Sequence, residues 1–211
     1  MYHLYLVVYN YFLVFGIKKL FESNYETTSR IASLSHSIVS TFLSSLFLFN
    51  IINYDIFVIG VWYNVIYITM DIYLYMYNKI SNKDKIEMMF HHIVFLIASY
   101  YSSLNPYFYS RGILTESSTI FLNLSWLIKN NGIIKNENLQ LLCLYLNKNI
   151  NILYLLVWIT FAIFRIINMD MLLYEMYYSK YSSFSILPIP FIILNKYWFY
   201  LINKKIYNYI I

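Results

Sequence analysis

The sequence predicts an all-α, polytopic integral membrane protein, a bundle of six to seven transmembrane helices around a polar interior. The 211 residues are 60% hydrophobic and only 12% charged, whereas soluble domains carry about 25% charged residues. Apolar runs follow one another along the whole chain, and most are nearly long enough to cross a bilayer as a helix. The few polar groups inside these runs recur at helical spacing, which indicates helices with one polar face each.

Seven apolar runs define the expected spans, and together they form one membrane domain over residues 1–211. Most approach the roughly 20 residues that a helix needs to cross the hydrocarbon core, although the first and fifth are short. The first run lacks a basic start and a small-residue cleavage site, so we expect a retained span and not a signal peptide. Pro188, Pro190 and Lys196 interrupt the seventh run, which leaves open whether it crosses. In chain order the runs cover about residues 2–17, 31–52, 56–77, 86–104, 113–128, 150–169 and 184–202.

The lysines and arginines predict the orientation. Positive charge accumulates in cytoplasmic loops, and most of the 15 basic residues follow the first, third and fifth spans or end the chain. The opposite loops hold only Arg111 and Lys180. We therefore expect a lumenal or external N-terminus, and a cytoplasmic C-terminus if the seventh run crosses. The residues on the expected cytoplasmic side are Lys18, Lys19, Arg30, Lys79, Lys83, Lys85, Lys129, Lys135, Lys148, Lys204 and Lys205.

Composition argues against several kinds of partner. The single cysteine, Cys143, leaves no disulfide framework and no paired-cysteine metal site. The formal net charge of +5 comes from basic residues scattered between apolar runs. This distribution favours a role of these residues in setting the orientation in the membrane over nucleic-acid binding. No nucleic-acid partner is therefore expected, and the protein is expected to be integral to the membrane. No cofactor is expected, and the oligomeric state is left open.

Several ionisable groups fall inside the spans. Such a group deep in a bilayer costs about 2.5–3.5 kcal/mol on insertion scales, so each needs a partner, water or a function. Counting along the expected helices places one set roughly 8–9 Å below the cytoplasmic boundary. This set is His36, Asp71, His91 and His92. Glu116 and Arg165 fall near the other end of their spans, so the sequence predicts two polar layers at different depths.

Polar residues recur at helical spacing within four spans, as a bundle around a polar or water-accessible interior requires. Ser, Thr and Asn also join membrane helices directly, so packing is the alternative for these residues. Glu116 with Arg165 is either a structural ion pair or a site for a ligand headgroup. The stripes are Ser33, His36, Ser40 and Ser44; Asn64, Tyr67, Asp71 and Asn78; Glu116, Thr119 and Asn123; and Asn151, Tyr154, Trp158, Arg165 and Asn168.

The adjacent His91 and His92 suit acid–base chemistry better than metal binding. Neighbouring residues on a helix point about 100° apart and do not easily ligate one ion, so no metal is expected. A neutral imidazole acts instead as a general base or nucleophile, and a carboxylate such as Asp71 fixes its tautomer and raises its basicity. We therefore expect His36, Asp71 and one histidine of the pair to converge on one interior site. The other histidine of the pair would hold a neighbouring helix.

Five segments, in order, carry a resemblance to a known family. They are "SRIASLSHSIVS", "YITMDIYLYMY", "HHIVFLIASYY", "GILTESSTIFLNLSWLI" and "ITFAIFRIINM". Over about residues 10 to 203 the chain resembles the TLC domain family, the TRAM, Lag1 and CLN8 homology group of polytopic membrane proteins. The Glu-Ser-Ser pattern at 116–118, followed by Asn123, is most similar to the branch of TLC domain-containing protein 4.

The resemblance implies two different functions. Lag1 members are ceramide synthases, which transfer a fatty acyl group from coenzyme A to a sphingoid amine with a histidine pair and two aspartates. This chain keeps His91 and His92, but Glu116 and Thr119 stand at the aspartate positions, which counts against acyl transfer. If that reaction held, acyl-CoA would be the substrate.

Other family members are linked to membrane lipid composition, lipid handling or protein export from the endoplasmic reticulum. The resemblance therefore favours a role in lipid homeostasis without an established reaction, in the endoplasmic reticulum or another endomembrane. It also implies that membrane lipids are the partners. A proton-coupled transporter is the third reading, although no internal repeat is evident. The candidate catalytic residues are His91, His92 and Asp71, and the candidate lipid-binding or ion-pair residues are His36, Glu116, Asn123 and Arg165.

Overall fold

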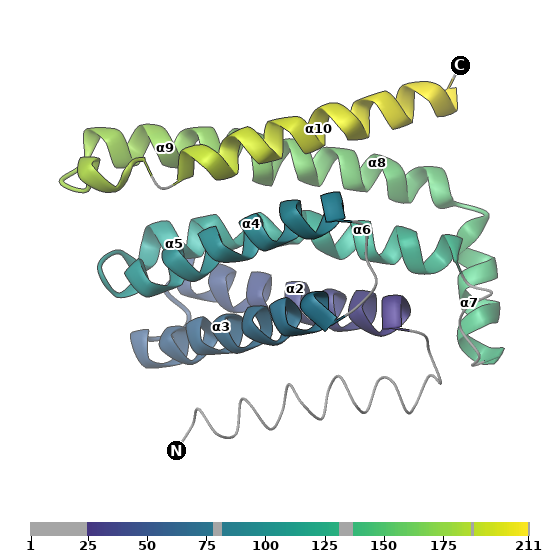
Figure 1. The fold of residues 1–211 in the computed structure, drawn as a ribbon, viewed down its shortest axis with the longest axis horizontal. Coiled ribbons are helices and arrows are strands. Elements are labelled where there is room, and N and C mark those ends of the chain that lie inside the picture. The colour runs from purple at the N-terminus through teal and green to yellow at the C-terminus, as the bar shows by residue number, and fades with distance from the viewer. Residues whose placement is uncertain (1–24, 78–81, 131–136, 187, 211) are drawn as a thin grey trace.

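A computed structural model of the protein describes residues 25–77, 82–130, 137–186 and 188–210. All regular elements within these ranges are helices (Figure 1). The expected first span, residues 2–17, lies outside the described residues, as do the basic residues Lys18, Lys19, Lys79 and Lys135.

Two long helices begin the described chain. Helix α2 (Tyr25–Leu48) and helix α3 (Tyr54–Tyr77) have 24 residues each, so each is roughly 36 Å long. Between them Asn50 adopts a left-handed conformation with φ of 57°, which an asparagine tolerates in a tight turn. A Cβ added at Gly60 would lie 3.2 Å from the Leu43 side chain, so glycine here lets α3 approach α2 closely.

The next part of the chain forms three α-helices, and a short break separates the last two. Helix α4 (Asn82–Tyr100) carries the two histidines and continues into the short helix η1 (Tyr101–Ser103). Helix α5 (Pro106–Ile113) begins after Asn105, whose side chain accepts a hydrogen bond from the Phe108 amide at 3.1 Å. Helix α6 (Glu116–Lys129) follows after Leu114 and Thr115. The helical region around the expected span 113–128 therefore starts earlier, at Pro106, and consists of two pieces.

The last third of the chain forms two more long helical segments. Helix α7 (Glu137–Asn147) lies across one end of the bundle (Figure 1). Helix α8 (Ile150–Thr160), the π-helix η3 (Phe161–Ile167) and helix α9 (Asn168–Tyr178) form one continuous segment. After the short helix η4 (Ser182–Phe184), helix α10 (Pro188–Ile210) returns along this segment. Because α9 continues to Tyr178, the helix extends beyond the expected span 150–169.

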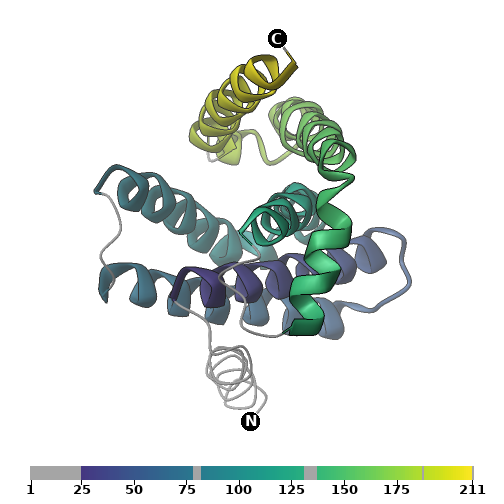
Figure 2. The ribbon, with the colours of Figure 1, turned by 90° about the vertical axis from the view of Figure 1, so that its right-hand side faces the viewer.

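Successive long helices run in alternating directions, and they form three layers (Figures 1 and 2). Helices α2 and α3 lie on one side, α4 and the α5–α6 pair lie in the middle, and α8, α9 and α10 lie on the other side. By length and composition, three helical stretches among the described residues are candidates to cross a membrane: Glu26–Leu48, Tyr54–Ile72 and Ile150–Tyr178. The predicted all-α, polytopic fold class is confirmed.

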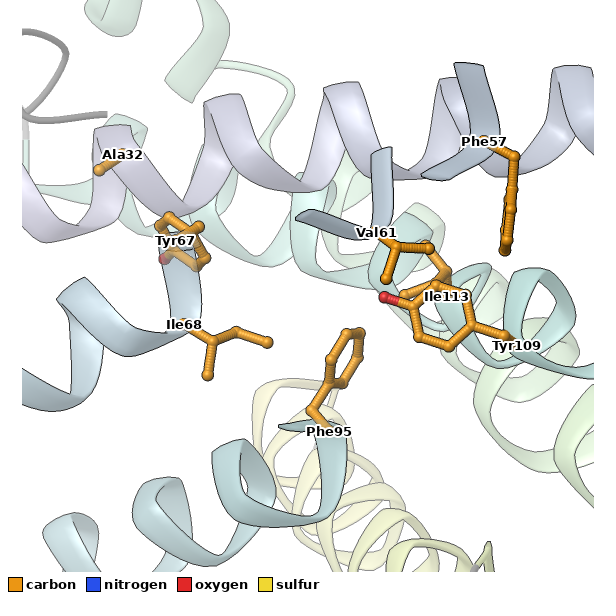
Figure 3. Close-up of a cluster of buried hydrophobic side chains, with 8 residues drawn as sticks. All are labelled: Ala32, Phe57, Val61, Tyr67, Ile68, Phe95, Tyr109 and Ile113. Carbon is orange, nitrogen blue, oxygen red and sulfur yellow. The ribbon is translucent and has the colours of Figure 1, made fainter. Parts of the chain in front are cut away.

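A hydrophobic cluster joins the first four helices of the described chain. In Figure 3, Phe95 of α4 points toward Val61 of α3 and toward Tyr109 and Ile113 of α5. Tyr67 and Ile68 of α3 belong to the same cluster and also line the polar cavity described below. The cluster therefore fixes α3 and α4 beside the polar groups that these helices carry.

Candidate functional site

A cavity of about 410 Å³ lies inside the bundle and receives side chains from α2, α3, α4, α6, η3 and α10. Its lining is rich in polar and ionisable groups that are themselves buried. All seven candidate site residues taken from the sequence line this one cavity. They are His36, Asp71, His91, His92, Glu116, Asn123 and Arg165.

His92 and Asp71 form the shortest ionisable contact in the cavity. His92 Nε2 lies 2.8 Å from Asp71 Oδ2, and both side chains are less than one-tenth exposed. With the proton on Nε2, the imidazole donates it to the carboxylate, and this hydrogen bond selects the tautomer of the ring. The contact joins α4 to α3.

His91 faces a different pair of charges. Its Nε2 lies 3.9 Å from Glu116 Oε1, and the same oxygen lies 3.9 Å from Arg165 Nη2. These separations exceed hydrogen-bond length, so Glu116 and Arg165 interact through charge and not through a direct hydrogen bond, and the His91 ring lies beside this pair. The Ser37 hydroxyl donates to the other Glu116 oxygen at 3.3 Å. The adjacent histidines therefore face two different carboxylates: His92 contacts Asp71, and His91 lies near Glu116.

Neutral groups, more than Glu116, hold the Arg165 guanidinium. Arg165 Nε donates to the Thr115 carbonyl at 3.2 Å and to Ser118 Oγ at 2.7 Å. Arg165 Nη2 donates to Thr119 Oγ1 at 2.7 Å, and Nη1 donates to Asn195 Oδ1 at 3.2 Å. The cation also lies over the rings of Phe161 and Trp198, with its Cζ 5.1 and 5.6 Å from their centroids. A buried arginine needs this many partners because its five donors have no water to bind.

The prediction of two polar layers at different depths is wrong. Glu116 lies within 4 Å of both His91 and Arg165, so the two expected layers form one. The error came from helix boundaries, because α2 begins before the apolar run 31–52 and α4 before the run 86–104. His36 and His91 therefore lie near the middle of their helices. Glu116 likewise lies near the middle of the α5–α6 pair.

The predicted polar stripe from Asn151 to Asn168 does not share one face. Arg165 points into the cavity, whereas Trp158 donates its indole N–H to Asn203 of α10 at 2.7 Å. Asn168 Nδ2 donates to the Arg111 carbonyl at 2.9 Å, outside the cavity. The reason is the π-helix η3, which contains Arg165 and has more residues per turn than an α-helix. The helical register therefore changes within the segment.

His36 and Asn123 lie on the cavity wall in different ways. The His36 ring stacks on Tyr67, with centroids 3.8 Å apart and an angle of 11° between the rings. Asn123 joins α6 to α2, since its Nδ2 donates to Ser33 Oγ at 2.9 Å and its Oδ1 accepts from Arg30 at 3.3 Å. Asn123 therefore contributes to packing as well as to the lining.

Two buried polar atoms beside the cavity have no hydrogen-bond partner among the described residues. They are His91 Nδ1 and Asn195 Nδ2. Buried polar groups are rarely unpaired in folded proteins. Within the described part of the chain, no three His, Cys, Asp or Glu side chains gather in a way that could hold a metal ion.

Comparison with known proteins gives the family. A family model for the TLC domain, the TRAM, LAG1 and CLN8 group, matches residues 3–204. The chain belongs to the TLC domain family. Neither the curated proteins nor the solved structures compared with this TLC domain gave a match.

Sequence reasoning missed several residues that complete the site of this TLC domain. Ser118 and the Thr115 carbonyl bind Arg165 from the start of α6, and their position next to Glu116 was the available signal. Asn195 and Trp198 come from α10. The prolines and Lys196 interrupt the apolar pattern of this helix, and no periodic polar stripe marks its inner face.

Proposed function

We propose that this TLC domain protein binds a membrane lipid in its polar cavity and acts in lipid handling or lipid homeostasis. The observation that carries the proposal is the convergence of buried ionisable groups from α2, α3, α4, α6 and η3 on one cavity of about 410 Å³. Ionisable residues within membrane spans are costly, and they mark functional sites by default. Lipid is the ligand class that the bilayer supplies at this depth.

The chemistry of the lining suits a headgroup that both donates and accepts hydrogen bonds. Asp71 and Glu116 offer carboxylates, whereas Arg165 offers a guanidinium. The unpartnered His91 Nδ1 adds a ring nitrogen that a ligand group would satisfy. A purely apolar ligand would leave these groups unpaired, at a large cost in free energy.

A second candidate function is acyl transfer of the ceramide synthase type, and the His92–Asp71 hydrogen bond favours it. In that reaction the acyl group leaves the sulfur of coenzyme A and forms an amide with a sphingoid amine, and the amine loses a proton. The imidazole would accept this proton. Thr119 weighs against the reaction, because it replaces a carboxylate and its hydroxyl accepts from Arg165.

The histidine pair provides the direct test of both functions. We expect membranes containing the wild-type protein to differ in lipid composition from membranes without it, and the His91→Ala/His92→Ala variant to abolish that difference. Lipidomics of matched membranes measures the effect. Tyr200→Ala is the control, because Tyr200 lies exposed on α10 and its loss should leave the profile unchanged. A difference that persists without both histidines would argue for scaffolding and against an internal site.

Within the family, we place the chain near the branch of TLC domain-containing protein 4, on the pattern of residues 116–118 and Asn123. We also propose an endoplasmic reticulum or other endomembrane location, with the lysine-rich end of the bundle in the cytoplasm. The C-terminal ends of α3, α6 and α10 all point to the same end of the bundle, as this orientation requires (Figure 1). Lys129 and Lys204 belong to that end.

Cysteine labelling tests the orientation. In a Cys143→Ser background, Lys148→Cys should react with an impermeant thiol reagent applied from the cytoplasmic side, and Asn53→Cys should not. Both residues are exposed, and they lie at opposite ends of the bundle. Labelling of Asn53→Cys alone from the cytoplasm would reverse the orientation.

A further inference from the structure

Helices α4 and α10 face each other across the polar cavity without close backbone packing. Helix α10 packs against α8, η3 and α9, and α4 packs against α3 and η1. Both nevertheless supply cavity walls. The residues concerned are Glu87, Met88 and His91 of α4 and Trp198, Leu201 and Ile202 of α10.

A second cavity lies beside one end of this seam, between α4, η1, α5, α9 and the start of α10. Its volume is about 380 Å³, and its lining is almost entirely apolar, including Phe90 and Val94 of α4 and Phe191 of α10. His91, which lines the polar cavity, stacks on Phe191 with ring centroids 5.1 Å apart. Phe95 lines both cavities, so the two are neighbours, and the His91–Phe191 stack joins a wall of one to a wall of the other.

The seam is also open toward the membrane. Leu201 lines the polar cavity and is 41% exposed, and Phe90 lines the apolar cavity and is 43% exposed. A residue that both lines a cavity and faces outward marks a route between that cavity and the outer surface of the bundle. The outward surface beside it is apolar, with Ile86, Ile97 and Ile193 exposed, so lipid chains border the route.

One hydrogen bond crosses the seam at the polar cavity. Trp198 Nε1 donates to Glu87 Oε2 at 3.2 Å. The same indole ring lies 5.8 Å from the His91 ring and 5.6 Å from the Arg165 cation. Moving Trp198 away from Glu87 therefore also uncovers the charged groups of the site.

We propose that a membrane lipid enters the polar cavity laterally between α4 and α10, and that the Glu87–Trp198 hydrogen bond is the latch of this portal. The proposal rests on the lipid-binding function proposed above. Opening mainly needs separation of side chains, because α4 and α10 have few close backbone contacts among the described residues. The lipid headgroup passes Trp198 while its chains stay in the apolar seam.

Matched tryptophan variants test the latch. The probe is a phospholipid with a diazirine on its headgroup, supplied in vesicles to the reconstituted full-length protein. The readout is the rate of labelling of the α2 residues within 29–36 that line the polar cavity. Trp198→Phe removes the donor and should speed labelling about tenfold, as loss of a hydrogen bond to a charged group implies. Trp158→Phe is the control, because its indole N–H binds Asn203 away from the seam, and it should match wild type.

Bridging the seam gives the opposite perturbation. In the Cys143→Ser background, Met88→Cys and Leu201→Cys joined by a cleavable bis-methanethiosulfonate should block labelling of α2, and reduction should restore it. Unchanged labelling in both the bridged protein and Trp198→Phe would overturn the portal and leave lipid binding intact. Absence of α2 labelling in every variant would overturn both proposals.

Discussion

An Asp71→Asn variant should lose the lipid phenotype of the protein about as fully as His92→Ala, and the double variant should be no worse than either. The carboxylate accepts a hydrogen bond from His92 at 2.8 Å in a buried setting. Such a charge-assisted bond contributes about 1.5–3 kcal/mol, so binding or turnover should fall about tenfold or more. Asparagine keeps the size of the side chain but removes the charge that fixes the imidazole tautomer.

Asp170→Asn is the matched control for this prediction. Asp170 makes an ion pair with Lys196 at 3.0 Å, but its side chain is 45% exposed and lies away from the cavity. The same chemical change there should leave lipid binding intact, as measured by photolabelling or by lipidomics. Losses that add in the Asp71→Asn/His92→Ala protein would mean that the two residues act separately.

Arg165→Leu should destabilise the protein more than any other single change at the site, by about 3–5 kcal/mol. The substitution leaves Glu116 as an uncompensated buried charge. It also removes the N–H groups that donate hydrogen bonds to the hydroxyls of Ser118 and Thr119. Adding Glu116→Gln should recover part of the loss, because the carboxylate is then neutral. The recovery should be incomplete, since the hydroxyls stay without their donor.

Thermal unfolding in detergent, with expression level as a second readout, measures this double-mutant cycle. Arg111→Leu is the control arginine, because its carboxylate partner Glu175 is 36% exposed and partly exposed pairs contribute less. Arg111→Leu should therefore cost less than Arg165→Leu. If the losses from Arg165→Leu and Glu116→Gln simply added, the two charges would not interact despite their 3.9 Å separation.

The membrane fold and the ionisable residues that line the polar cavity could be predicted because both depend on rare groups in an apolar chain. Asp71 and His92 could be predicted as site residues from the sequence, because an ionisable group within a span needs a partner. Their depth could not be predicted from apolar runs alone. Helix α4 begins at Asn82, among charged residues, and this start moves His91 to the middle of the helix.

The partners of Arg165 required the three-dimensional structure. Hydrophobic periodicity assumes one helical repeat, and the π-helix η3 departs from that repeat at Arg165 itself. The break at Leu114 and Thr115 had no proline to mark it, yet it lies where the Thr115 carbonyl accepts a hydrogen bond from Arg165. Both features depend on packing against neighbouring helices and leave little trace in the local sequence.

The break between α5 and α6 places two helix ends in the centre of the bundle. The N-terminal end of α6 carries partial positive charge, and Glu116 occupies its first turn. Arg165 binds at the same helix start, through the Thr115 carbonyl and the hydroxyls of Ser118 and Thr119. Glu116 therefore faces a helix dipole of opposite sign, whereas Arg165 depends on hydrogen-bond acceptors that offset the partial positive charge of this helix end. Exchanging the two charges would keep an ion pair but place a cation at residue 116, against the dipole of α6, so the backbone favours the carboxylate on α6 and the guanidinium on η3.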